Sequence, residues 1–468
     1  MKTIKIHADD NVAVVIEAEG KIPFGHKLAL AAIPAGEHVI KYGHPIGSAT
    51  SDIQPGEHVH VHNVKTNLSG TLTYSYNPIA HKQPSGYQID TFMGYRRSDG
   101  KAGVRNEIWV ISTVGCVNKI AEKIARLSGA YTFSHPYGCS QLGDDHEFTQ
   151  NILKGLVNHP NAGGVLVLGL GCENNNIAEF QKILKTWDDE RVKFLNVQDV
   201  RDDVEEGIKL VKQLHDNANQ IKREPIPVKE LVIGLKCGGS DGLSGITANP
   251  LVGKLSDYII DQGGSCVLTE VPEMFGAEAL LLDRCVSDDV FNKSVDMING
   301  FKEYFIRHGQ VVYENPTLGN KEGGITTLEE KSLGCTQKGG AGPVVDALYC
   351  GETVTETGLS LLNGPGNDIV AVTNLVAAGV HIVLFTTGRG TPLGGPVPTV
   401  KISSNSALAK AKPGWIDFNA GAMLEGNNME KVAKEFIQYV MKVASGELVK
   451  NEVNDYREIA IFKDGVTM

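Results

Sequence analysis

Four stretches of the chain are apolar and rich in β-branched residues, and each then breaks into glycine and polar residues. They cover residues 110–116, 165–172, 231–239 and 381–390. Each stretch is typical of a buried parallel strand whose carboxyl end continues into a functional loop. Ligands bind at that edge in open α/β sheets. The pattern therefore predicts a polar crevice at strand ends, lined by residues that include Cys116, Cys172 and Cys237.

The rest of the sequence divides into parts around these strands. Residues 1–72 alternate apolar and polar side chains between glycines, which predicts a small all-β domain. Residues 73–90 are polar, contain prolines and lack periodicity, which indicates a linker. Residues 91–227 and 228–468 alternate strands with helices, and a charged stretch with prolines at 222–227 separates them. We expect an α/β protein with a small N-terminal β domain and two α/β domains with mainly parallel, Rossmann-like sheets.

Apolar runs and helical periodicity predict the individual elements of the two α/β domains. Strands are expected at residues 108–114, 164–170, 192–197, 231–236, 265–269 and 381–386. Helices are expected at residues 117–127, 175–186, 200–216, 250–262 and 429–445. Glycine-rich loops are expected at residues 319–324, 338–342 and 388–395.

Composition excludes several classes of protein. Lysine and arginine number 44 against 55 aspartate and glutamate residues, a net charge of −11 without a basic stripe, so nucleic acid is not an expected partner. The chain has no apolar run of membrane-spanning length and begins without a secretory signal, so we expect no membrane and a cytoplasmic location. Asn174 stands where a dinucleotide fingerprint has its third glycine, which disfavours a dehydrogenase. The eight cysteines are expected as reduced thiols, and a homo-oligomer is compatible with the sequence.

Histidines cluster near the beginning of the chain. His58, His60 and His62 alternate with other residues, so a strand would project all three imidazoles from one face. His26 could join them on a divalent metal ion, because imidazoles two residues apart on a strand can converge. The alternative is a solvated histidine face without a metal.

Residues 133–146 combine a thiol, imidazoles and carboxylates in one loop-like stretch. His135, Cys139, Asp144 and His146 are the kinds of group that acid–base catalysis or metal binding requires. The alternative is structural: Asp144 caps a helix and Cys139 is a small buried residue.

Two further loops offer groups that suit an anionic, hydroxylated ligand. Arg105 lies in the loop 94–106, and its guanidinium fork matches a carboxylate, unless the loop is a surface turn with solvated charge. The loop 236–250 follows a strand and precedes a helix, so its amides can bind an anion while its side chains bond hydroxyls. Asn249 also fits as the cap of the next helix.

Several longer sequence segments, spread over essentially the whole chain, together resemble the altronate/galactarate dehydratase family of sugar-acid hydro-lyases. The segments lie at residues 25–27, 41–43, 58–63, 103–106, 113–118, 137–145, 169–175, 237–250, 268–278 and 332–338. The resemblance implies that the N-terminal domain is of the SAF type. It also implies dehydration of D-altronate to 2-dehydro-3-deoxy-D-gluconate in hexuronate (galacturonate) breakdown, with Fe²⁺ or Mn²⁺ as cofactor.

Joined to that resemblance, the residues above give a site hypothesis. The metal ligands are His26, His60 and His62, and the catalytic candidates are His135, Cys139, Asp144 and His146. The substrate-binding candidates are Arg105, Asn106, Lys236, Ser240, Asp241 and Asn249. The alternatives are dehydration of galactarate or another sugar acid, an iron–sulfur dehydratase, and a sugar-acid binding protein without turnover. The iron–sulfur alternative uses Cys116, Cys172, Cys237 and Cys335.

Overall fold

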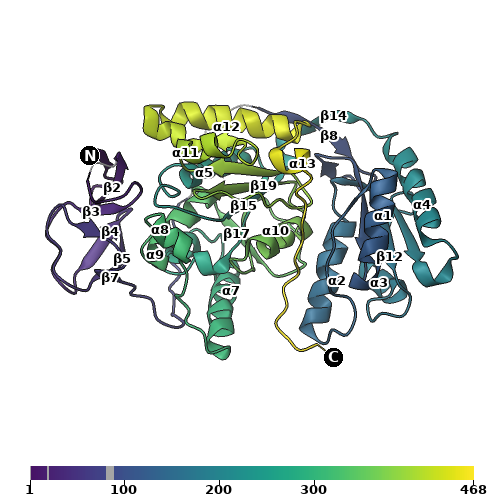
Figure 1. Cartoon of the computed structure of the whole chain (residues 1–468), viewed down its shortest axis with the longest axis horizontal. Coiled ribbons are helices and arrows are strands. Elements are labelled where there is room, and N and C mark those ends of the chain that lie inside the picture. The colour runs from purple at the N-terminus through teal and green to yellow at the C-terminus, as the bar shows by residue number, and fades with distance from the viewer. Residues whose placement is uncertain (1, 18–19, 81–88, 468) are drawn as a thin grey trace.

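A computed structural model describes residues 2–17, 20–80 and 89–467. Three domains lie side by side: a small β domain on the left of Figure 1, the largest domain in the centre and the second α/β domain on the right. Part of the stretch interpreted as a linker, residues 81–88, lies outside the described residues. Within the described ranges, no helix has both the length and the hydrophobicity needed to span a membrane.

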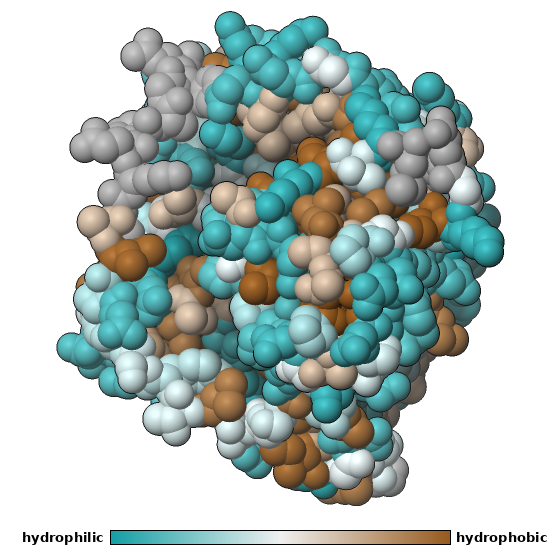
Figure 2. Space-filling model, turned by 90° about the vertical axis from the view of Figure 1, so that its left-hand side faces the viewer, coloured by the Kyte–Doolittle hydropathy of each residue, from teal (hydrophilic) through white to brown (hydrophobic). Residues whose placement is uncertain are grey.

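The N-terminal domain consists of two small sheets. One sheet has the order β1-β2-β3-β6 and the other the order β4-β5-β7. Its core, which includes Val39 and Ile46, is completed by Leu333 from the central domain. Figure 2 shows the molecule from this side, with apolar residues interspersed among polar ones on the surface. The strands are β1 (Lys2–Ile4), β2 (Val12–Glu17), β3 (Lys27–Ala29), β4 (His38–Lys41), β5 (His44–Ala49), β6 (His58–Val59) and β7 (Val64–Lys65).

The expectation of one strand through all three histidines of residues 58–62 is wrong. Strand β6 ends at Val59, and a turn follows in which Asn63 N–H donates to the His60 carbonyl. The Asn63 side chain closes the same turn by accepting from His60 N–H (2.9 Å). A side chain that bonds nearby backbone competes with the strand ladder, which explains the early end of β6.

The second domain contains a parallel sheet of order β11-β10-β12-β13. Every strand and helix predicted for this sheet is present, with ends shifted by a few residues. The prediction missed α2, because residues 133–146 were interpreted as loop-like and the helix begins at Asp144. The elements are β10 (Glu107–Ser112), α1 (Asn118–Ser128), β11 (Tyr131–Thr132), α2 (Asp144–Val157), β12 (Ala162–Gly169), α3 (Ile177–Leu184), β13 (Val192–Asn196) and α4 (Asp203–Ala218).

A three-stranded antiparallel sheet of order β14-β8-β9 joins the second and central domains. Its strands are β8 (Thr91–Arg96), β9 (Ala102–Gly103) and β14 (Arg223–Pro227). The stretch 222–227, interpreted from sequence as an interruption, is thus mostly strand. Its prolines are tolerated because β14 is an edge strand.

The central domain is built on a parallel sheet of order β17-β18-β16-β15-β19-β20-β21. Strand β15 comes first in the chain, and the chain continues to β16 on one side and later to β19 on the other. The strands are β15 (Val232–Cys237), β16 (Ser265–Leu268), β17 (Val344–Leu348), β18 (Gly358–Leu362), β19 (Ile382–Thr387), β20 (Thr399–Ser403) and β21 (Phe418–Asn419).

Helices cover both faces of this sheet. Along β19, Ile382 and Leu384 face a core shared with α5 and α12, whereas Val383 and Phe385 face a core shared with α10. The second core continues into α2, so the second domain is packed onto the central one. The helices are α5 (Ala248–Asp261), α6 (Ala279–Leu282), α7 (Asp288–Arg307), α8 (Leu318–Glu322), α9 (Leu328–Cys335), α10 (Asp368–Ala377), α11 (Ser406–Ala411), α12 (Met429–Ala444) and α13 (Lys450–Val453).

Candidate active site

A pocket of about 820 Å³ opens at the carboxyl ends of β15, β18 and β19. Open parallel sheets bind ligands where connections leave neighbouring strands in opposite directions, as they do on the two sides of β15. The segments 237–239, 366–369 and 391–393 form walls of the pocket. The other lining residues are Glu273, Asn315, Thr317, Asn320, Lys331, Trp415, Tyr456 and Glu458.

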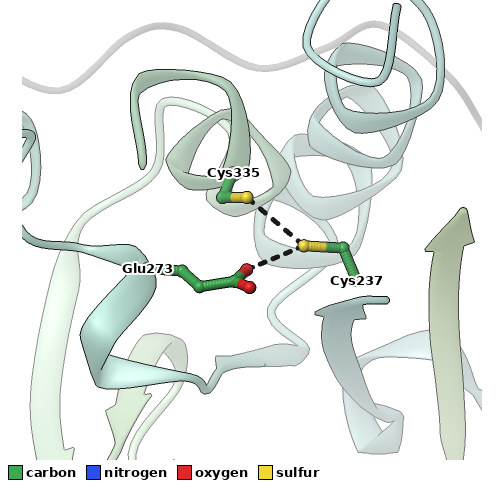
Figure 3. A group of neighbouring side chains, drawn as sticks. All are labelled: Cys237, Glu273 and Cys335. Atoms are coloured by element: carbon green, nitrogen blue, oxygen red, sulfur yellow. Dashed lines mark hydrogen bonds between the residues drawn. The ribbon is translucent and has the colours of Figure 1, made fainter. Parts of the chain in front are cut away.

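Three buried side chains from separate segments meet at this pocket, pointing toward one another (Figure 3). Cys237 ends β15, Glu273 lies in a short turn after β16, and Cys335 ends α9. The Cys237 thiol donates to Glu273 Oε2 (2.8 Å), and the two sulfur atoms are 3.3 Å apart. Among the described residues, this is the one group of three potential metal ligands whose atoms all lie within 4.8 Å of one another.

Two buried lysines bring positive charge to this group. Lys338 Nζ donates to Cys237 Sγ (3.0 Å), and Lys331 Nζ pairs with Glu273 Oε1 (2.7 Å). Burial raises the pKa of Glu273, but the two ammonium charges outweigh it and lower that pKa to about 2. The hydrogen bond with Cys335, assisted by the Lys338 charge, lowers the pKa of Cys237 to about 7 against the effect of burial. Cys237 can therefore exchange a proton near neutral pH beside an ionised Glu273.

Buried lysines and carboxyl groups lie close together around the pocket. A third buried lysine, Lys236, pairs with Asp368 and lies 3.2 Å from Glu270. Burial and the nearby Glu273 charge raise the pKa of Glu270 well above its usual value, although Lys236 opposes this shift. Three ammonium groups, those of Lys236, Lys331 and Lys338, thus lie among the carboxyl groups of Glu270, Glu273, Asp368 and Glu458. Lys331 is the lysine that lines the pocket, so it is the group that can attract a carboxylate-bearing molecule.

Sequence reasoning missed Glu273 and Lys331 as site residues, and it named Cys335 only as a ligand in the iron–sulfur alternative. Lys331 and Cys335 nevertheless share a readable signal. Lys331 and Cys335 are four residues apart on α9 and so lie on one face of that helix. Thr327 caps this helix by accepting from Glu330 N–H, a recognisable start signature. Glu273 follows Glu270, whose φ of 71° is left-handed, and no periodicity marks such a segment.

Arg105 and Asn106 are committed to contacts within the protein. Arg105 forms a bidentate pair with Glu452 (2.7 and 2.9 Å), and Asn106 bonds Arg97 and the Ala218 carbonyl. Neither residue lines the pocket, and Arg105 has no N–H group left for a substrate carboxylate. Its remaining donors go to the carbonyls of Val104, Val443 and Glu447.

The other predicted substrate ligands lie next to the pocket but serve mainly as its support. Asp241 accepts from Ser244, Ser404 and Asn405, and it fixes the loop after β15. The Asn249 side chain joins the Gly334 carbonyl to Thr386. The Ser240 hydroxyl is buried and has no hydrogen-bond partner among the described residues. Lys236 supports the pocket indirectly through Asp368, which lines it.

The predicted acid–base residues lie in the second domain and do not line the 820 Å³ pocket. His135 is 2% exposed; its Nε2 bonds the Ser112 carbonyl (2.8 Å) and its Nδ1 accepts from Tyr137 N–H (3.2 Å). Asp144 starts α2 and lines a separate cavity, His146 lies in the first turn of that helix, and Cys139 is exposed. Catalytic roles for these residues stay predictions that the geometry does not favour.

The N-terminal histidines do gather, and His58 joins them. The rings of His26, His58, His60 and His62 lie with neighbouring centroids 4.8–5.5 Å apart. His26 Nδ1 and His58 Nε2 face each other at 3.0 Å. Burial lowers the pKa of His58 to about 4 and of His60 to about 3, so both are neutral, the form that binds metals.

The outer nitrogens of two of these rings already have partners. His26 Nε2 bonds the Glu322 carbonyl (3.1 Å), and His60 Nδ1 bonds Thr326 Oγ1 (3.1 Å). Metal-binding histidines usually have such second bonds, which leave the other nitrogen for the ion. Glu322 ends α8, whose Asn320 lines the pocket. The cluster lies directly behind one wall of the pocket and offers neutral imidazoles, but in the described structure no three of its rings offer nitrogens that all lie within 4.8 Å of one another. The rings would have to turn toward a common point to share one ion.

This fold and this pocket, with a thiol that can exchange a proton near neutral pH, are those of an α/β enzyme suited to acid–base chemistry. The chain belongs to the altronate/galactarate dehydratase family, whose members are hydro-lyases. Family models match the C-terminal part of D-galactarate/altronate dehydratases at residues 228–467, their second domain at residues 94–219 and their SAF domain at residues 15–67. The family resemblance and the expected fold class are thereby confirmed.

Individual relatives match over the full length. The altronate dehydratase of Bacillus subtilis (strain 168) is 55% identical, with 99% of each chain covered. The altronate dehydratase of Escherichia coli (strain K12) is 52% identical, with 100% of each chain covered. The galactarate dehydratase (L-threo-forming) of Escherichia coli is 31% identical over 98% of this chain and 96% of its own.

Proposed function

We propose that this chain dehydrates D-altronate to 2-dehydro-3-deoxy-D-gluconate and water, in the cytoplasm, during galacturonate breakdown. Identity of 52–55% to two altronate dehydratases, against 31% to a galactarate dehydratase, favours altronate as the substrate. The observation that carries a catalytic role for the pocket is the Cys237–Glu273 pair, held between two buried lysines.

The substrate carboxylate is assigned to the positive side of the pocket. Lys331 Nζ lies at the pocket wall, and its three N–H groups face Glu273, Asn315 and Asn320 (2.7, 3.0 and 3.2 Å). A substrate carboxylate would take the place of one of the two asparagine oxygens. Removal of the C2 proton places negative charge on the carboxylate, and a preorganised ammonium group stabilises that charge. The Asn315 amide lines the pocket and is positioned to bond a substrate hydroxyl, whereas Asn320 Nδ2 already donates to the Ser240 carbonyl (2.9 Å).

Cys237 is assigned the proton transfers. As a thiolate it takes the proton from C2, and as the resulting thiol it protonates the C3 hydroxyl, which leaves as water. The enol product then tautomerises to the 2-keto acid. A pKa of about 7 suits a group that must both accept and donate a proton near neutral pH. Glu273 orients the thiol by accepting its hydrogen bond.

A divalent ion, Fe²⁺ or Mn²⁺, is assigned to the histidine cluster. His26, His58 and His60 would hold it, with His62 beside them, and a bound ion supplies a Lewis acid. The histidines also hold the domains together. His26 bonds the Glu322 carbonyl at the end of α8 and so fixes the N-terminal domain against the helix that carries Asn320.

The test is a turnover assay with metal-free, anaerobically prepared protein. D-altronate, galactarate and gluconate are incubated with and without Fe²⁺ or Mn²⁺, and 2-keto-3-deoxy acid is measured. We expect product from altronate, dependent on added ion. The H60N variant should bind less metal by elemental analysis, whereas H44N, which changes an exposed histidine, should not. Binding of sugar acids without product would instead identify a binding protein.

A further inference from the structure

The second domain places three cysteines at one edge of its sheet. Cys139 follows β11, Cys116 follows β10 and Cys172 follows β12, and these strands are adjacent and parallel in the order β11-β10-β12. The carboxyl ends of adjacent parallel strands meet at the same edge. All three thiols are free and exposed, whereas the free thiols of Cys237 and Cys335 in the central domain are buried.

The three cysteine-bearing loops are fastened to one another. Gly115 N–H donates to the Tyr137 carbonyl (2.9 Å), and Asn175 N–H donates to the Gly138 carbonyl (3.0 Å). Gly138 has a φ of 101°, and a Cβ there would lie 2.0 Å from the Thr113 carbonyl oxygen, so only glycine permits this approach. The bonds therefore fix the relative positions of the thiols before any ligand arrives.

Unpartnered polar atoms accompany the thiols. Ser112 Oγ at the end of β10, Asn118 Oδ1 two residues beyond Cys116, and Asn196 Oδ1 at the end of β13 are buried without a hydrogen-bond partner among the described residues. Buried polar atoms without partners are rare and require an explanation such as an absent ligand. Their position at the same end of the same sheet points to a ligand at this edge.

We propose that Cys116, Cys139 and Cys172 bind a [4Fe–4S] cluster, with one iron left without a cysteine ligand. A single tetrahedral ion with metal–sulfur bonds of about 2.3 Å needs thiolates about 4 Å apart. These three sulfur atoms do not all lie within 4.8 Å of one another, so they do not form a site for a single ion as placed. Three free cysteines on joined loops at one edge of one sheet favour a cluster instead, because iron–sulfur clusters are held by cysteine thiolates. The iron without a thiolate is open to a carboxylate or hydroxyl oxygen of a small molecule.

The proposed set of three ligands differs from the four cysteines of the iron–sulfur alternative considered from the sequence, which included Cys237 and Cys335. The structure places those two in the buried group of the central domain and Cys116 and Cys172 on the exposed edge of the second. The proposal concerns a site separate from the pocket, so it does not depend on the proposed dehydration.

The experiment measures iron and acid-labile sulfide in the full-length protein after anaerobic reconstitution with ferrous iron and sulfide. We expect about four of each per chain, with visible absorbance that oxygen bleaches. The variants C116S, C139S and C172S should each lose most of the sulfide and the absorbance. C350S, which changes a half-buried cysteine elsewhere, and C237S should keep both.

Three results would overturn the proposal: iron without sulfide, a cluster retained in the triple serine variant, or a cluster lost in C237S. Far-ultraviolet circular dichroism of each variant separates loss of the cluster from misfolding. Because the substituted thiols are exposed, serine should leave the spectrum unchanged. If one variant does misfold, the other two single variants still decide the result.

Discussion

The central and second domains both place cysteines at the carboxyl ends of parallel strands, yet they surround them differently. In the central domain, Cys237 is 1% exposed and contacts Glu273, Cys335 and Lys338. In the second domain, Cys116, Cys139 and Cys172 are exposed, and the hydrogen bonds to their sulfur atoms come from uncharged side chains, Ser140 to Cys139 and Gln198 to Cys172. The same sequence pattern therefore produces two different environments.

Burial decides what each thiol can do. The hydrogen bond with Cys335, assisted by the lysine charges, lowers the pKa of the buried Cys237 thiol, so this thiol suits proton transfer. Exposed thiols on fastened loops have no such partners, and they suit a ligand that several of them share. The comparison teaches that a cysteine after a strand identifies an edge of the sheet, and the partners from distant segments determine its chemistry.

The largest expected effect on activity comes from the C237S variant, which replaces the buried thiol of the central domain. Removing a group that transfers protons typically lowers the rate by about 10²–10⁴-fold. We expect kcat with D-altronate to fall by at least about 100-fold while the fold stays intact. C285S, which changes another buried cysteine outside the pocket, should stay within a few-fold of the unmodified protein. Activity retained in C237S would remove Cys237 from the mechanism.

The second prediction concerns buried charge that joins the N-terminal domain to the central one. Glu330 pairs with Lys27 (2.8 Å) and Lys41 (2.7 Å), and all three side chains are buried. Glu330→Gln leaves two ammonium groups without their carboxylate, which typically costs about 3–5 kcal/mol. We expect that loss in the free energy of unfolding, measured with urea at pH 7.

The control for Glu330→Gln is an exposed ion pair in the second domain. Glu179 pairs with Lys182 on α3, and both side chains are largely exposed. Glu179→Gln should cost less than about 1 kcal/mol. The pH dependence adds a further check. Although burial opposes it, the lysine charges lower the pKa of Glu330 to about 2, so its stabilisation is complete above about pH 4.5 and disappears as pH falls toward 2. Equal losses in both variants would contradict this account.

Most of the fold was readable in the sequence because its signals are local. The apolar run at β12 and the periodicity of α5 and α12 each extend over enough residues to identify an element. Three longer helices, α2, α7 and α10, were nevertheless not predicted. Short elements were also missed: α9 has eight residues, and β14 contains two prolines. Their formation depends on tertiary contacts that a local pattern does not contain.

The site was less readable, because a charged residue does not reveal its partner. Arg105 suggests a carboxylate ligand, but the carboxylate it binds is Glu452, 347 residues later in the chain. Lys331 and Glu273, by contrast, were not predicted as site residues but lie at the pocket. Neither stands in a recognisable motif, and only folding brings them into contact. The histidines near the beginning of the chain were found because three of them lie within five residues.

The third prediction is a shift in pH dependence. If Cys237 acts as a thiolate, kcat/KM should rise with pH and level off above about pH 7. Lys338 favours the thiolate, Lys331 does so more weakly, and Glu273 opposes it. Lys338→Gln should therefore raise the pKa of Cys237 and move the rise to higher pH by about one unit. Lys254→Gln, on the exposed side of α5, should leave the profile in place, and an unshifted profile in Lys338→Gln would count against Cys237 as the base.

The smallest expected effect on catalysis comes from His135 in the second domain. His135→Gln should lower kcat less than about tenfold, because both ring nitrogens bond backbone groups and the residue does not line the pocket. It should cost about 1–3 kcal/mol of stability, since it leaves buried backbone groups without partners. Steady-state kinetics and urea unfolding of one preparation measure both effects. If kcat instead fell by about 100-fold or more at unchanged stability, His135 would be restored as a catalytic residue. Substrate would then have to reach the thiol-bearing edge of the second domain during turnover.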